Sequence, residues 1–101
     1  MEKLRPTHSL PAFKQAFASP AVLVATTTAF NDAAALGYDK VGIVRVIQAM
    51  APRHFYKSMT SFADHREWQD VYHVPVEGYV IYLKFTAHAL TGFHLLSFKE
   101  K

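Results

Sequence analysis

The sequence predicts an α+β fold in which N-terminal helices pack on one face of a small antiparallel β-sheet. In the first half of the chain, apolar residues recur at helical spacing between capping and helix-ending residues. In the second half, apolar and polar residues alternate in segments separated by short glycine-containing turns. Because these strands follow one another without intervening helices, we expect antiparallel pairing and one sheet face that the helices leave free.

The first predicted helix begins after Ser9, whose hydroxyl is suited to an N-cap, and has Pro11 in its first turn. Its apolar residues fall on one face: Leu10, Phe13 and Phe17. The pair Ser19-Pro20 ends the helix. Residues 21–28 (AVLVATTT) are rich in β-branched side chains and are therefore predicted to form a short strand.

Two more helices are expected before the sheet. Residues 29–37 (AFNDAAALG) form the second, which Gly37 closes. Asp39 caps the third, and the pair Ala51-Pro52 ends it. The apolar side of this third helix consists of Val41, Val44 and Ile47, with either Ile43 or Met50.

The second half of the chain contains three predicted strands. Residues 68–74 form one, and the pair Glu77-Gly78 turns the chain into the next, 78–87 (GYVIYLKFTA). The alternation gives this strand two faces, Tyr79, Ile81, Leu83 and Phe85 on one and Val80, Tyr82, Lys84 and Thr86 on the other. The last strand, 94–101, follows a turn that contains Thr91-Gly92. If the first face meets the helices, Tyr82 and Lys84 point towards solvent.

Length and composition limit the possible classes of protein. A chain of 101 residues predicts a single domain, 1–101, and 50% hydrophobic residues are enough for a core. The formal charge of +3 is a mild basic bias that permits contact with polyanions but is also common in other proteins. The charged N-terminus resembles no secretory signal, and no apolar run approaches the ~20 residues of a membrane span. We therefore expect a cytoplasmic protein without a membrane partner.

Several chemistries lack the residues that they require. With no cysteine, the chain has no disulfide, no thiolate nucleophile and no cysteine-based zinc site. The six histidines include no H-x-x-x-H pair, and the four glycines form no phosphate-binding loop. We expect neither a metal nor a cofactor.

The segment 54–74 mixes cations, aromatic rings and hydrogen-bonding side chains in a way that neither a core nor a linker requires. Together with the last two strands it offers cations for phosphate: Lys57, Arg66, Lys84 and Lys99. It also offers rings that stack on unpaired bases: Tyr56, Phe62, Trp68, Tyr72, Tyr79 and Tyr82. Packing is the more common role for Trp68, Phe62 and Tyr79.

Three stretches in the same order resemble the MqsR family of bacterial type II toxins: FYKSMTSFADHREWQDVY (55–72), VIYLKF (80–85) and SFKEK (97–101). The resemblance covers nearly the whole chain. It implies a RelE-like fold and a sequence-selective endoribonuclease that cuts mRNA and stops growth. It also implies a cognate MqsA-like antitoxin, which is a zinc-binding helix-turn-helix protein. The antitoxin binds DNA, so the toxin is associated with DNA only indirectly.

The family's active site uses two lysines, a glutamine and a tyrosine, and the resemblance assigns these roles here to Lys57, Gln69, Tyr82 and Lys99. Metal-free RNA cleavage by the substrate's own 2′-OH needs cations and proton-transfer groups, which such residues supply. The RNA-binding candidates are Tyr56, Arg66, His73 and Lys84. The sequence leaves the general base open, because His65 and His73 flank Gln69 and an imidazole titrates near neutral pH. An alternative function is a non-catalytic RNA-binding or partner-binding module on the same scaffold.

Overall fold

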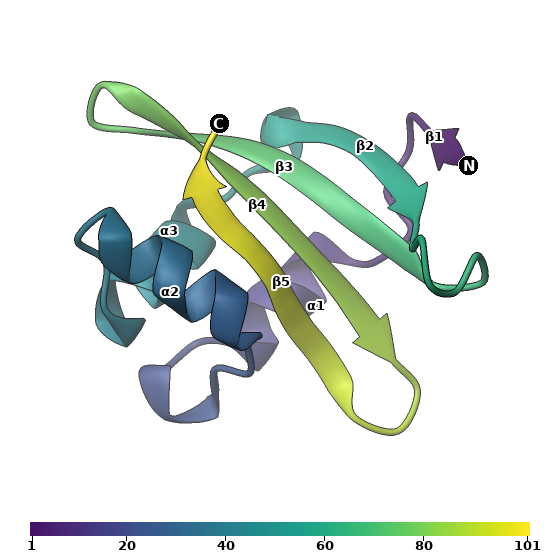
Figure 1. Ribbon diagram of the computed structural model, residues 1–101, viewed down its shortest axis with the longest axis horizontal. Coiled ribbons are helices and arrows are strands. Elements are labelled where there is room, and N and C mark those ends of the chain that lie inside the picture. Colours follow the sequence, from purple (N-terminus) through teal and green to yellow (C-terminus); the bar gives the residue numbers. More distant parts are fainter.

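The computed structural model describes all 101 residues as three α-helices and five strands. The helices are α1 (Leu10–Ala16), α2 (Thr27–Ala35) and α3 (Lys40–Ala49). The strands are β1 (Glu2–Lys3), β2 (Phe55–Thr60), β3 (Trp68–Val76), β4 (Tyr79–His88) and β5 (Gly92–Glu100). They form one antiparallel sheet in the order β1-β2-β3-β4-β5 (Figure 1). The predicted α+β class is confirmed.

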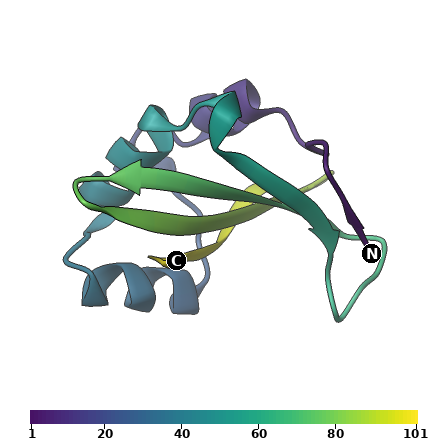
Figure 2. The same cartoon turned by 90° about the horizontal axis from the view of Figure 1, so that it is seen from above.

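The helices are arranged so that part of the sheet stays open. Figure 2 shows α1 and α3 on one side of the sheet, while α2 packs along the outer strand β5. Phe13 of α1 stacks on Phe85 of β4, with ring centroids 3.8 Å apart. The core also includes Ile43 and Ile47 of α3 and Phe98 of β5, all nearly or fully inaccessible. No helix combines the length and the apolar character that crossing a bilayer requires.

Side-chain caps define the helix starts. The Ser9 hydroxyl accepts a hydrogen bond from the Ala12 amide, and the Asp39 carboxylate accepts one from the Gly42 amide at 2.8 Å. Both predicted caps are confirmed. Gly37 follows the end of α2 with a φ of +90°, a conformation that favours glycine, as the predicted helix closure requires.

The predicted strand at residues 21–28 is wrong. The chain forms a short 3-10 helix, Pro20–Val22, and α2 already begins at Thr27. The Thr26 hydroxyl accepts a hydrogen bond from the Ala29 amide, so the threonine run starts a helix instead of extending a strand. Within this stretch, only Ala25 forms a β-bridge, which pairs it with Leu95 at the outer edge of β5.

The three aromatic side chains that were expected to pack differ in how far they are buried. Phe62 is fully exposed in the β2–β3 loop, so the expected packing role is wrong for this residue. Trp68 is half-buried, with the Lys3 ammonium 4.1 Å from its ring centroid. The phenol of Tyr79 donates to that of Tyr38 at 2.7 Å, which agrees with the packing role expected for Tyr79.

Candidate functional site

One face of the sheet, opposite α1 and α3, collects most of the predicted site residues. Residues directly opposite each other in an antiparallel pair project from the same face. The register aligns Lys57, Val71, Lys84 and Ser97 across four strands. The neighbouring row is His73, Tyr82 and Lys99. We call the surface formed by Tyr56, Lys57, His73, Tyr82, Lys84 and Lys99 the open face.

Tyr56 joins this surface through an irregularity in the β2–β3 pairing. Phe55 pairs with Tyr72 and Lys57 with Val71, so Tyr56 is an extra residue in a β-bulge. Its exposed ring stacks on the imidazole of His73 at a centroid distance of 4.2 Å and an angle of 21°. The bulge thus lets two consecutive side chains, Tyr56 and Lys57, contribute to the same face.

Lys57 is held by an acidic partner that the sequence analysis missed. The Lys57 Nζ lies 2.6 Å from the Glu2 Oε2, which β1 carries across from the neighbouring strand. The hydrogen bond and charge of Glu2 raise the pKa of Lys57, and those of Lys57 lower the pKa of Glu2. Lys57 is therefore a stable ammonium group. The aromatic and β-branched residues of FYKSMT, Phe55, Tyr56 and Thr60, could have indicated β2, but no local signal pairs it with β1.

Tyr82 lies at the centre of the open face. Burial raises the pKa of its phenol, an effect that the nearby Lys57 charge opposes. The Lys99 ammonium is 5.3 Å from the Tyr82 ring centroid. Since the phenol stays protonated at neutral pH, Tyr82 is a hydrogen-bond or proton donor between two cations.

Two further titratable groups of this face, Lys84 and His73, are destabilised in their charged forms. Burial and the charge of Lys99 lower the pKa of Lys84. Burial lowers the pKa of His73, and the charges of Lys101 and Lys57 lower it further. The smaller, repulsive contributions of Lys99, Lys101 and Lys57 to these shifts arise because several cations lie close together, which makes the surface suited to a polyanion.

Two predicted residues are less closely associated with the open face. Gln69 shares its side of β3 with Val71 and is 8% exposed, and its amide nitrogen donates to the Glu67 carboxylate at 3.0 Å. Arg66 lies in the β2–β3 loop and pairs with Asp64 at 3.2 Å. The structure therefore brings together six of the predicted residues, places Gln69 beside them with its amide engaged, and leaves Arg66 outside.

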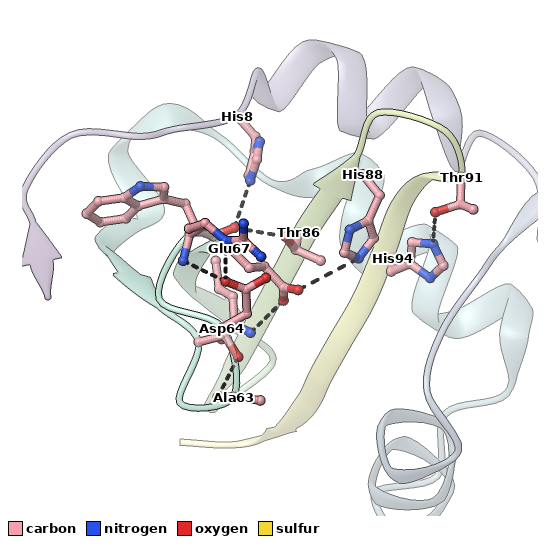
Figure 3. A network of polar contacts seen from close by, with 12 residues as sticks. His8, Ala63, Asp64, Glu67, Thr86, His88, Thr91 and His94 are labelled. Atoms are coloured by element: carbon pink, nitrogen blue, oxygen red, sulfur yellow. Dashed lines mark hydrogen bonds and ion pairs between the residues drawn. The ribbon is translucent and has the colours of Figure 1, made fainter.

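A second polar cluster lies around the β2–β3 loop and the β4–β5 hairpin. In Figure 3, His88 points towards Glu67, with 3.9 Å between the Nε2 and Oε2 atoms. The imidazole of His94 packs edge-on against that of His88. The Nε2 of His8 is hydrogen-bonded to the Trp68 carbonyl. A cavity of about 520 Å³ adjoins this cluster. No group of three or more metal-ligating side chains gathers anywhere in the chain.

The chain matches a known protein family and a full-length relative. A family model described as "Motility quorum-sensing regulator, toxin of MqsA" matches residues 5–100. The chain belongs to this family. It is also 38% identical to the mRNA interferase toxin MqsR of Escherichia coli (strain K12), over the full length of both chains. The resemblance to the MqsR family inferred from the three sequence stretches is therefore confirmed.

Proposed function

We propose that this protein is a metal-independent, sequence-selective endoribonuclease, an mRNA interferase that inhibits growth as the toxin of a toxin–antitoxin system. The observation that carries the proposal is the placement of Lys57, Tyr82 and Lys99 on one open face of the sheet. The full-length relative is named an mRNA interferase toxin, which supports the same activity here.

The chemistry begins with the substrate's own 2′-OH, which attacks the adjacent phosphorus. The phosphorane gains negative charge, and the ammonium groups of Lys57 and Lys99 offset it. The protonated phenol of Tyr82 donates to the leaving 5′ oxygen. The products are a 2′,3′-cyclic phosphate and a 5′-hydroxyl, so no enzyme nucleophile, metal or cofactor is required.

The other residues bind and orient the RNA. Gln69 exchanges its bond with Glu67 for a phosphate oxygen or a base edge. The exposed ring of Tyr56 stacks on an unpaired base, and Lys84 contacts phosphate from the centre of the face. Arg66, outside the open face, contacts the strand where it passes the β2–β3 loop.

The family description also implies a partner, since it names a toxin of MqsA. The proposed partner is an MqsA-like antitoxin with a zinc-binding region and a helix-turn-helix domain. Association with DNA then occurs only through that antitoxin. A protein that cuts mRNA acts in the cytoplasm.

Incubation with single-stranded RNA in EDTA tests the activity. We expect fragments that end in a 2′,3′-cyclic phosphate, and their release should be roughly 10²–10³-fold slower with a Lys57→Ala protein purified in parallel, which controls for contaminating nuclease. Intact RNA that is bound with a salt-dependent affinity would instead indicate the non-catalytic RNA-binding module. Binding to an antitoxin without affinity for RNA would indicate a partner-binding module.

A further inference from the structure

The proposed cleavage needs a group that removes the proton from the 2′-OH, and most candidates on the open face are unsuited. The pKa of Lys57 is raised by Glu2, so Lys57 holds its proton at neutral pH. The pKa of Tyr82 is raised by burial, so the phenol does the same. Glu2 is already paired with Lys57, and its lowered pKa makes it a weak base.

His73 differs from these groups in both position and chemistry. It is opposite Tyr82 in the β3–β4 register, and the two ring centroids are 5.9 Å apart. Tyr56 stacks on its other side at 4.2 Å, which fixes the plane of the imidazole. The residue stays partly exposed at the open face.

We propose that His73 is the general base of the cleavage reaction, taking the proton from the attacking 2′-OH. This inference rests on the proposed endoribonuclease function. The O2′–phosphorus bond forms as the proton moves to the imidazole, and the phosphorus–O5′ bond breaks as Tyr82 donates its proton to O5′. Proton exchange from the imidazolium to the phenolate through solvent restores both groups, so protons and charge balance over the cycle.

The surroundings of His73 favour the neutral, basic form. The aromatic rings of Tyr56 and Tyr82 face the imidazole. The charges of Lys57 and Lys101 also act on it. Lys99 lies beyond Tyr82, and Glu2 lies beyond Lys57. Burial and the two nearer lysines lower the pKa of His73. The imidazole is therefore unprotonated at neutral pH, and kcat/KM should fall in acid, below the ordinary histidine pKa of about 6.5.

The test compares His73→Gln and His73→Ala with His65→Gln, which removes an exposed loop histidine. Cleavage of RNA in EDTA is followed from pH 5 to pH 8, and affinity is measured with fully 2′-O-methylated RNA, which lacks the attacking group. We expect kcat/KM of His73→Gln to fall by roughly 10²–10⁴-fold. Affinity should change only a few-fold, the acid limb of the pH profile should disappear, and added imidazole should restore part of the activity of His73→Ala.

Three results would overturn the inference. If folded His73→Gln cleaves RNA at a near wild-type rate with the same acid limb, His73 is not the general base, although the proposed function still holds. A loss of cleavage matched by an equal loss of affinity makes His73 an RNA contact only. If the wild-type protein does not cut RNA, the proposed function and the inference fail together. His73→Asn replaces His73→Gln if thermal melting shows that the glutamine variant is unfolded.

Discussion

The Glu2 carboxylate and the Lys57 ammonium lie 2.6 Å apart across the β1–β2 pair. This contact joins an N-terminal residue to the first predicted catalytic cation. Glu2 is the more exposed partner, with 57% of its side chain accessible against 22% for Lys57. An RNA phosphate that binds Lys57 must therefore compete with a carboxylate at the rim of the site.

The first prediction concerns this competition. Glu2→Gln removes one negative charge beside the open face, and RNA affinity should rise several-fold at low salt, because Lys57 becomes free to bind phosphate. Titration of 2′-O-methylated RNA at several salt concentrations measures the effect. Glu100→Gln is the matched control, since Glu100 pairs with Ile81 and projects from the opposite face. Weaker RNA binding by Glu2→Gln would mean that the carboxylate holds Lys57 in its active position.

The second prediction tests the site assignment. Lys57→Ala and Tyr82→Phe should each reduce RNA cleavage by roughly 10²–10³-fold, as expected when a donor to the transition state is lost. Growth arrest should disappear with it. Neither side chain is part of the apolar core, so the melting temperature should change little. Lys40→Ala, on α3, should retain full activity. Two folded variants that remain fully toxic would refute the assignment.

Local features of the structure could be predicted from the sequence. The caps at Ser9 and Asp39 depend on side chains that bond amides three residues away, so a short window contains the information. The β4 alternation likewise separates buried Ile81, Leu83 and Phe85 from Tyr82 and Lys84. The placement of the Tyr82–Lys84 pair on the face opposite α1 and α3 was correct for this reason.

Long-range features could not be predicted in the same way. The Glu2–Lys57 contact depends on pairing between residues 55 positions apart, and the Tyr56 bulge depends on how β2 meets β3. At residues 21–28, β-branched composition favoured a strand, but the Thr26 cap and the apolar packing of α2 determined the outcome. The β-branched composition was outweighed there by a local helix cap together with tertiary packing.

A third prediction concerns the anchor of the N-terminal segment. The fully buried Asp70 carboxylate accepts hydrogen bonds from the amides of Thr7 and His8, the shorter at 2.8 Å. Asp70→Ala leaves both amides without this acceptor, at a cost of about 1.5–3 kcal/mol for each charge-assisted bond. Urea unfolding should show the loss. At urea concentrations below the new unfolding midpoint, RNA cleavage should also change, because the N-terminal segment that Asp70 anchors carries β1 and Glu2. Unchanged stability would show that water replaces the carboxylate.

The fourth prediction is a loss of stability in mild acid. The Nδ1 of His54 accepts a hydrogen bond from the Ala51 amide at 3.0 Å, and protonation would remove that acceptor. Burial lowers the pKa of His54, as do the charges of Arg53 and Lys14. Below the ordinary histidine value of about 6.5, the unfolded chain therefore binds the proton more readily than the folded one. The stabilisation is complete above that pH and is lost as pH falls through the lowered pKa.

Melting temperatures between pH 7.5 and pH 5 measure this effect in the wild type and in His54→Gln, whose amide oxygen can still accept a hydrogen bond but does not titrate. The wild type should lose several degrees over this range, and the variant should lose less. The carboxylates with resolved shifts, Glu2 and Asp64, have lowered pKa values and stay ionised in this window, so they do not mask the histidine effect. His73, whose pKa is also lowered, contributes to the slope that remains, and His54→Gln/His73→Gln should flatten it further. Parallel curves for the wild type and the double variant would place the acid sensitivity in other groups.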